Sequence, residues 1–395
     1  MVLLSCLLVT KQSGSAAACD GLISRASEET PFLLDDLALV DLQQSVDRSI
    51  VFLSKIKKDE EFEFCGRTFS ADHLRLTLEF FSRGLTVFRD EREFQRFLLN
   101  NFILCRAKGT TGTGTMLVTG YYEPLLSGSF EKKAPYIYPL YRPPDDLVHR
   151  ARVDGNNEMG RIVNGEFFPY WTRSEIEQGK LPPGGEILYL ADPVDVFVLQ
   201  VQGSGRVRLQ DGSVRKVRYA ANNGRQYRSI GRLLVDRGVM TMEEVTLPKI
   251  IDYLHAHPDE LEGILHYNER YVFFSLVDVK KESLQEGPLG SMGQPLTPGR
   301  SMAVDKKCFP APMVGYLETE MPLFDEKGNL VEWRKMHRFV VNQDSGAAIQ
   351  GPGRVDLFLG GDKFAEQAAG VMKQPGTLSF FLLKDGKDFT KVFGN

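Results

Sequence analysis

Apolar residues recur at helical spacing through the first part of the chain, and this pattern predicts that residues 36–107 are mainly helical. The clearest segments are LVDLQQSVDRSIVFLSKI, ADHLRLTLEFFSRGL and DEREFQRFLLNNFILC. The glycine-rich segment KGTTGTG then interrupts the pattern. Residues 115–126 (TMLVTGYYEPLL) follow with the composition of a strand.

Strand-like alternation becomes prominent after this point. Residues 134–144 (APYIYPLYRPP) carry prolines, which favour an edge strand or an extended segment. Residues 195–222 hold three strand candidates. Asp211-Gly212 stands between two alternating arms of this stretch and predicts a hairpin turn.

The last third of the chain is predicted to be mostly short strands. Two helical segments at 229–239 and 246–265 precede it. Strands are then predicted at 270–277, 301–305, 313–321, 337–344, 355–360 and 377–383, with a Gly- and Pro-rich loop at 287–298. The sequence contains no internal repeat. The predicted fold class is α+β with β-barrel-like parts.

Composition limits the function classes. The chain has 395 residues, enough for about two domains. Its net charge is −4, so no overall field attracts nucleic acid. No stretch of apolar residues is long enough to predict a transmembrane helix.

The N-terminal residues 1–20 have the features of a secretion leader. MVLLSCLLV is apolar but short, and the small residues Ala16, Ala17 and Ala18 precede Cys19. We expect export, with Cys19 as the site of a lipid anchor; a disordered tail is the alternative. Of the other cysteines, Cys65 and Cys105 either pair in an oxidising compartment or are buried free thiols.

Several kinds of catalytic site are not supported by the sequence. KGTTGTGT lacks the Gly-Lys-Ser/Thr ending of a phosphate loop and reads as a plain loop. The chain has no HExxH motif, and His255 and His257 are two residues apart, so we expect no metal site and no cofactor. A G-x-S-x-G serine motif and an evident Cys–His pair are also absent from the sequence.

Three aspartates share a pattern that points to carboxylate chemistry. Asp305, Asp344 and Asp356 each follow or interrupt a short apolar run that predicts a strand. Asp356 is the clearest case, because VDLFLG places an acid where a buried residue is expected. We infer that the three acids converge at one end of a barrel. The alternative is that each caps a strand or a turn.

The chain resembles the lytic murein transglycosylase A (MltA) family in several motifs that occur in the same order. These are VTGYYEP, FPYWTRSEI, VQGSGRV, YAANNGRQYRSIGR, NERYVFF, SMAVD and QDSGAAIQGPGRVDLFLGG. The last two match the so-called 3D domain, which is named for three aspartates. Leu359 departs from the family pattern, which usually has an aromatic residue there, and the following glycines are shortened to Gly360-Gly361.

The resemblance implies a fold and a domain division. A double-psi β-barrel with N-terminal helices would comprise residues 21–124 and 270–395. A smaller β-barrel domain would be inserted at 125–269 and would line a groove for a glycan strand. The expected substrate-binding residues are Tyr121, Tyr122, Glu123, Gln202, Gly203, Ser204, Asn222 and Asp305. The tyrosines would stack on sugars, and the alternative is that they pack in the core. The alternative for the QGSG motif is that it forms a bulge or a turn.

The resemblance also implies an activity. Asp356 would cleave the MurNAc-β-1,4-GlcNAc bond of peptidoglycan as a single acid and base, and the C6 hydroxyl of MurNAc would close a 1,6-anhydro ring. The apolar neighbours of Asp356 would keep it protonated. Asp344 would serve for orientation or would stabilise the oxocarbenium-like state electrostatically. The alternatives are an inverting hydrolase that uses Asp344 and Asp356 and a non-catalytic glycan-binding module. Expected partners are glycan strands and other cell wall enzymes, at the outer membrane facing the periplasm.

Overall fold

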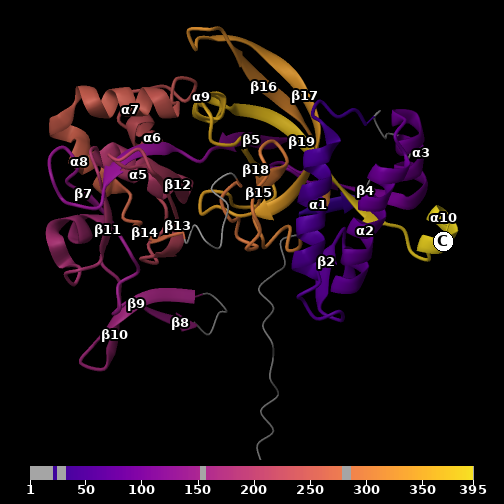
Figure 1. The fold of residues 1–395 in the computed structure, drawn as a ribbon, viewed down its shortest axis with the longest axis horizontal. Helices are drawn as coiled ribbons and strands as arrows, with labels where there is room; N and C mark the ends of the chain where they lie inside the picture. The colour runs from indigo at the N-terminus through magenta and orange to yellow at the C-terminus, as the bar shows by residue number, and fades with distance from the viewer. Residues whose placement is uncertain (1–20, 25–32, 152–156, 278–285, 395) are drawn as a thin grey trace, which may run out of the picture.

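A closed six-stranded β-barrel lies at the centre of the computed structural model, between N-terminal helices on one side and a second β-sheet on the other (Figure 1). The structure describes residues 21–24, 33–151, 157–277 and 286–394. The predicted leader at 1–20, with Cys19, lies outside the described residues. The α+β class with a closed barrel, predicted from the pattern and the resemblance, is confirmed.

The barrel joins one strand that precedes the second sheet in the chain to five strands that follow it. Around the barrel, the order is β5–β18–β15–β17–β16–β19, and β19 pairs again with β5. The pairs β5–β18 and β15–β17 are parallel, and the others are antiparallel. The strands are β5 (Met116–Tyr121), β15 (Ser301–Ala303), β16 (Val314–Phe324), β17 (Leu330–Asp344), β18 (Arg354–Phe358) and β19 (Lys373–Leu383).

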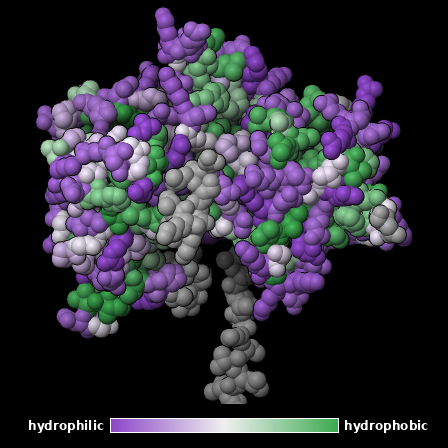
Figure 2. All heavy atoms as spheres, viewed as in Figure 1, coloured by the Kyte–Doolittle hydropathy of each residue, from purple (hydrophilic) through white to green (hydrophobic). Residues whose placement is uncertain are grey.

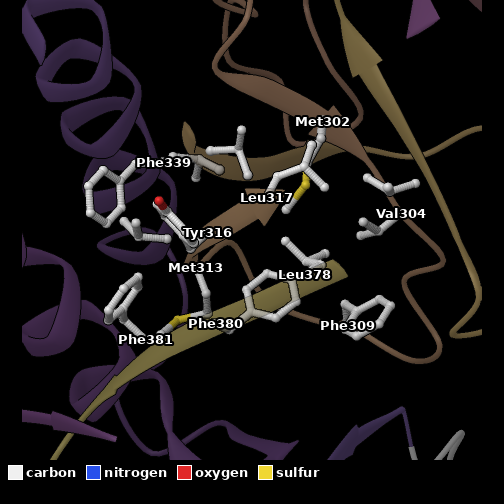
Figure 3. Packing of buried hydrophobic residues seen from close by; sticks show 14 of the residues in the cluster. Met302, Val304, Phe309, Met313, Tyr316, Leu317, Phe339, Leu378, Phe380 and Phe381 are labelled. Carbon is white, nitrogen blue, oxygen red and sulfur yellow. The ribbon is translucent and has the colours of Figure 1, made fainter. Parts of the chain in front are cut away.

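The barrel interior and the N-terminal helices share one hydrophobic core. Figure 3 shows Met302, Leu317 and Phe380 packed between the barrel strands. Phe81 of α2 (Ala71–Val87) packs edge to face on Phe339, with ring centroids 5.5 Å apart. Burying aromatic rings in this way stabilises the contact between helix and barrel by their area and their geometry.

On the surface, hydrophilic residues cover most of the face seen in Figure 2.

The stretch 36–107 is less helical than predicted. It contains α1 (Leu39–Leu53), α2 and α3 (Glu91–Asn101), but also the hairpin β2 (Glu61–Phe64) and β3 (Arg67–Ser70), and β4 (Phe102–Ala107). β4 pairs with β19 and with β1 (Leu22–Ser24) beyond the barrel. The short strands were missed because neighbouring helical periodicity dominated the pattern.

A disulfide ties the β2–β3 hairpin to β4. Cys65 and Gly66 form the turn of the hairpin with φ of 53° and 67°. Positive φ at both central residues is the geometry that a two-residue hairpin prefers. This turn places Cys65 beside Cys105, with 5.9 Å between their Cα atoms, and the structure joins the two in a disulfide. Of the two interpretations for these cysteines, the structure therefore has the pair.

The second sheet has six strands in the order β14–β13–β12–β6–β11–β7. β7 contains Pro139 and lies at the edge of the sheet, as the prolines predicted. Asp211-Gly212 forms the turn between β12 and β13, as predicted, and Gly212 has φ 82°. The strands are β6 (Leu125–Ser129), β7 (Tyr138–Tyr141), β11 (Glu186–Leu190), β12 (Ser204–Arg208), β13 (Val214–Asn222) and β14 (Val272–Leu276).

A separate three-stranded sheet protrudes beside the six-stranded sheet (Figure 1). Its strands are β8 (Val148–Ala151), β9 (Asn157–Val163) and β10 (Glu166–Pro169). The remaining elements are α4 (Arg173–Glu175), the π-helical turn η2 (Ile176–Lys180), α5 (Pro193–Gln202), α6 (Ile230–Asp236), α7 (Leu247–Ala256), α8 (Pro258–Tyr267), α9 (Lys363–Val371) and α10 (Phe389–Phe393). Over the described part of the chain, none of the helices has the length and apolarity to cross a membrane.

One of the three strand candidates at 195–222 was wrong, because its first part is helix α5. Asp192 caps this helix by accepting a hydrogen bond from Val194 N, and Pro193 occupies the first turn. Gly203 ends the helix in the left-handed region. The helix is apolar on most sides because it is largely buried, and such a run does not distinguish a helix from a strand. The other two candidates are β12 and β13.

Candidate active site

A cleft of about 470 Å³ lies between the barrel and the second sheet with its helices. Two carboxylates, Asp344 and Asp356, are among its lining residues. The opposite wall comes from α5, α6 and α7 and the segment before β14. Of the predicted site residues, the cleft is lined by Tyr121, Gln202, Asp344 and Asp356.

Asp356 lies in β18 with its side chain on the cleft face of the sheet. Its neighbours Val355 and Leu357 are fully buried in the core. Successive side chains of a strand point to opposite faces, so the two apolar neighbours face inward and the acid between them faces the cleft. The apolar run therefore holds a carboxylate at a hydrophobic wall.

The surroundings of Asp356 favour its protonated form. Burial raises its pKa from 3.8 to about 6, and the nearby charge of Asp344 acts in the same direction. The Thr119 hydroxyl donates a hydrogen bond of 2.8 Å to Asp356 Oδ1, and Arg354 lies nearby; both lower this pKa. Thr119 is opposite Asp356 in the parallel β5–β18 pairing. The result is an acid that can carry a proton near neutral pH.

Asp344 ends β17, and both of its carboxylate oxygens accept hydrogen bonds. Tyr121 Oη donates to its Oδ2 and Ser291 N donates to its Oδ1, both at 2.8 Å. Burial is the largest effect and raises the pKa of Asp344 above its ordinary value, while these hydrogen bonds and Lys306 oppose the rise. Since two donors address this carboxylate directly, it is suited to remain charged beside a developing cation.

The sheet register explains why the two acids come together. Ala303 of β15 is paired with Asp344 on one side and with Asp356 on the other. The acids therefore flank a single short strand, and their backbones are two strand spacings apart, about 10 Å. The predicted convergence holds for these two aspartates.

Asp305, the third aspartate, does not line the cleft that holds Asp344 and Asp356. Its Oδ1 accepts from Lys307 N at 2.9 Å, and its Oδ2 accepts from Gly351 N at 2.7 Å. Asp305 instead joins the turn after β15 to the loop between β17 and β18, so its oxygens are occupied by the backbone as in a turn-forming aspartate.

The two tyrosines of GYYEP have different environments. Tyr121 lines the cleft, and its ring lies 5.3 Å from that of Phe358. Tyr122 is only 6% exposed and packs in the barrel core. A sugar cannot stack on a ring that is covered by the core, so the expectation of a stacking platform at Tyr122 is corrected to core packing.

Glu123 is also buried, at 5% exposed, and connects the barrel to the second sheet. Its Oε2 lies 3.3 Å from Arg206 Nε of β12, and burial raises its pKa. The same arginine donates to the carbonyl of Gly361, and Glu123 N donates to the carbonyl of Gly360 at 2.8 Å. The expected sugar contact is replaced by an ion pair that holds the two parts together.

The QGSG motif forms the junction between α5 and β12. Gln202 lines the cleft, and its Oε1 accepts from Tyr122 N at 3.2 Å. Gly203 caps the helix with φ 83°, and Ser204 begins β12 opposite Arg218. Neither Gly203 nor Ser204 lines the cleft. Gly203 and Ser204 therefore fit the interpretation of this motif as a turn, and only Gln202 of the motif lines the cleft.

Asn222 and Leu359 have local structural roles. Asn222 Oδ1 accepts from Gly224 N at 2.8 Å, which shapes the turn after β13. Leu359 is buried, and a Cβ on Gly120 would lie 2.6 Å from its Cδ1. Leu359 therefore packs beneath the cleft and does not line it.

Sequence reasoning did not single out several residues of the cleft. These are Thr119, Tyr227, Asn268, Arg270 and Arg354. All five lie within the motifs that carried the resemblance, which was the available signal. Among the described residues, no group of three or more His, Cys, Asp or Glu side chains is placed to hold a metal ion.

The chain is similar to known proteins over most of its length. The MltA specific insert domain matches residues 117–275, and the 3D domain matches residues 300–382. Membrane-bound lytic murein transglycosylase A of Escherichia coli (strain K12) is 29% identical over 309 residues, which cover 77% of this chain and 74% of that protein.

Solved structures show the same relationship. A membrane-bound lytic murein transglycosylase from Agrobacterium tumefaciens is 26% identical with a TM-score of 0.73, covering 92% of this chain and 98% of the other. A lytic transglycosylase of Burkholderia pseudomallei is 30% identical with a TM-score of 0.54, covering 93% and 97%. E. coli MltA with bound chitohexaose shares the fold, with 23% identity and a TM-score of 0.68 over 92% and 94%.

The barrel, the insert and the carboxylate cleft define an enzyme of the lytic transglycosylase class. Within this class, the chain belongs to the MltA family and carries a C-terminal 3D domain.

Proposed function

We propose that this enzyme cleaves the MurNAc-β-1,4-GlcNAc bond of peptidoglycan and releases 1,6-anhydro-MurNAc ends. The observation that carries the proposal is the environment of Asp356, a cleft carboxyl whose pKa is raised to about 6 by burial. The names of the relatives, which describe murein transglycosylases, support the substrate class. Chitohexaose, which is bound to E. coli MltA, is a glycan.

In the first step, protonated Asp356 donates its proton to the oxygen that links MurNAc to GlcNAc. The bond from C1 breaks, and positive charge develops on the MurNAc ring. Asp344, held by Tyr121 and Ser291, stabilises this charge as a carboxylate. A buried anion at this place acts with little screening, because the cleft wall beside it is apolar.

In the second step, Asp356 acts as the base. It is now a carboxylate and accepts the proton of the MurNAc C6 hydroxyl while that oxygen bonds to C1. The nucleophile belongs to the substrate, so one carboxyl serves both transfers and returns to its protonated state. No water, metal or cofactor enters this sequence. Thr119 keeps the carboxyl oriented throughout.

An inverting hydrolase is the competing mechanism. It would use Asp344 as the base for a water and Asp356 as the acid, since both acids line one cleft. Tyr121 and Ser291 donate to both oxygens of Asp344, and hydrogen bonds to the charged form make this carboxylate a weaker base for water. The third reading, a binding module without catalysis, leaves the raised pKa of Asp356 without a role.

We further propose two domains divided as the sheets are. The insert begins after β5 and extends through β14, which pairs with β13, so its end lies beyond the boundary at 269 expected from the resemblance. Gln202 would contact the glycan, together with Asn268 and Arg270, which line the same cleft. For location, we propose the periplasmic side of the outer membrane with a lipid at Cys19. The relatives of this chain include enzymes named as membrane-bound, which supports a membrane location.

The test is digestion of purified peptidoglycan by the wild-type protein and by Asp356→Asn. Asp362→Asn is the matched control, because this exposed aspartate only caps α9. The proposal predicts soluble muropeptides from the wild type and the control and none from Asp356→Asn. An Asp356→Asn protein that releases muropeptides at nearly the wild-type rate would refute the role of this residue.

A further inference from the structure

A second cavity, of about 460 Å³, lies beside the cleft, and no step of the proposed reaction uses it. It is bounded by α7, α9 and the β16–β17 hairpin, and α9 lies between the other two elements in Figure 1. Leu247, Ile251, Gly370 and Val371 line both this cavity and the cleft. The two spaces therefore share one wall.

The walls of the second cavity are apolar and its charges are negative. Leu247, Pro248 and Phe324 are among the apolar residues that line it. Asp252 of α7 and Glu366 of α9 are the charged residues, both exposed, and the described residues that line the cavity include no Lys or Arg. A ligand for this space would combine an apolar stem with a positive charge.

Tyr122 supplies a second and independent observation. This residue is 6% exposed and lines the cavity, and its hydroxyl makes no hydrogen bond with any described residue. Burial raises its pKa, and the charges of Glu366 and Asp195 act in the same direction. The hydroxyl oxygen is not among the buried polar atoms enclosed by protein, so it is accessible at the cavity wall and has hydrogen-bonding capacity left for a ligand there.

We propose that the second cavity binds an alkylammonium group, an aliphatic chain that ends in a protonated amine. The apolar walls would hold the chain, and Asp252, Glu366 and the Tyr122 hydroxyl would surround the ammonium. A primary ammonium has three donors and no acceptor, which matches these acceptors. An anion would meet only like charge here.

The amine in our proposal belongs to a diamino acid in the peptide stem that is attached to the glycan strand of peptidoglycan. This assignment of the amine rests on the proposed function. A glycan in the cleft lies across the shared wall from the cavity. An extended stem of three residues reaches about 10 Å, and the two spaces share Leu247, Ile251, Gly370 and Val371 as lining residues. The cavity would then select stems that keep a free amine.

The first experiment measures binding directly, by NMR titration of the full chain with pentylamine. 1-Pentanol has a similar shape without the charge and serves as the comparison ligand. We expect pentylamine to bind more tightly, and we expect Asp252→Asn/Glu366→Gln to weaken it about five-fold for each charge removed. Tyr122→Phe should also weaken it, whereas Glu61→Gln, at an exposed acid of the distant β2, should not.

Equal affinities for pentylamine and pentanol would overturn the ammonium site. So would an Asp252→Asn/Glu366→Gln protein that folds and binds pentylamine like the wild type. This titration needs no cleavage, so it tests the cavity even if the proposed reaction is wrong.

The second experiment tests the stem as the source. Peptidoglycan is compared before and after acetylation of its stem amines, and with stems removed. For the wild type, KM should rise about five-fold or more on acetylation, with little change in kcat, while Asp252→Asn/Glu366→Gln should show no such difference. If pentylamine binds but acetylation leaves KM unchanged, the ammonium site stands and the stem is rejected as its source. A wild-type protein that cleaves none of these substrates contradicts the proposed function instead.

Discussion

The hydrogen bond from Thr119 to Asp356 should set the pH at which the enzyme loses activity. Replacing Thr119 with Val keeps the β-branched shape that suits β5 and removes only the hydroxyl. The 2.8 Å bond stabilises the charged carboxylate and lowers its pKa. Its loss should therefore raise the pKa of Asp356 above the present value of about 6.

The size of this change follows from two magnitudes. A hydrogen bond to a charged group contributes about 1.5–3 kcal/mol, and one pKa unit corresponds to about 1.4 kcal/mol. Because Asp356 is partly accessible and water can replace part of the bond, we expect a rise of about one unit. At pH 7, the protonated fraction would then increase from about one tenth to about one half.

The assay is kcat/KM on purified glycan strands from about pH 4 to about pH 9. Since the free enzyme needs a protonated acid, kcat/KM should fall above a midpoint near 6 in the wild type and near 7 in Thr119→Val. Thr119→Ser keeps a hydroxyl and should keep the wild-type midpoint. A midpoint in Thr119→Val that is unchanged or lower, in a protein that still binds glycan, would refute the reasoning.

Three further predictions concern other parts of the structure. Asp356→Asn should lower turnover by at least about 10²–10⁴-fold. The same substitution should stabilise the fold at about pH 8 by up to about 3 kcal/mol but not below pH 4, because the pKa raised from 3.8 to about 6 penalises only the charged form. Thermal melting of both proteins at the two pH values checks this. Tyr121→Phe should lower kcat more than it raises KM, because it removes one of the hydrogen bonds that hold Asp344; steady-state kinetics decide, and an unchanged kcat contradicts it. Cys65→Ser should cost up to about 4 kcal/mol in denaturant unfolding, since the bond to Cys105 closes a loop over a separation of 40 residues; the difference should vanish in a reducing agent.

The sequence was sufficient to locate the two central acids. Asp356 interrupts a strand pattern, and period-two alternation brings such a residue to the face opposite its apolar neighbours. Asp344 ends another strand, and only the sheet order, with β15 between them, makes the two acids neighbours. Asp305 shows the same pattern but binds backbone, so the pattern alone does not separate a catalytic acid from a turn-forming one.

Other assignments depended on tertiary contacts that no local pattern encodes. Tyr121 and Tyr122 are adjacent and so point to different sides, and the sequence does not tell which one faces the cleft. Glu123 is matched by Arg206, which is far along the chain, so its burial as an ion pair was not visible in its motif. Helix α5 was taken for a strand because its apolar residues are buried on most sides.

The most direct test of the central claim is mass spectrometry of peptidoglycan digested by the wild-type protein in isotopically labelled water. If the MurNAc C6 hydroxyl is the nucleophile, as the single-carboxyl mechanism of Asp356 requires, the new MurNAc ends will be anhydro ends, one water lighter than reducing ends and free of label. Reducing MurNAc ends that carry the heavy oxygen would contradict the account and show that water attacks C1, as in an inverting hydrolase.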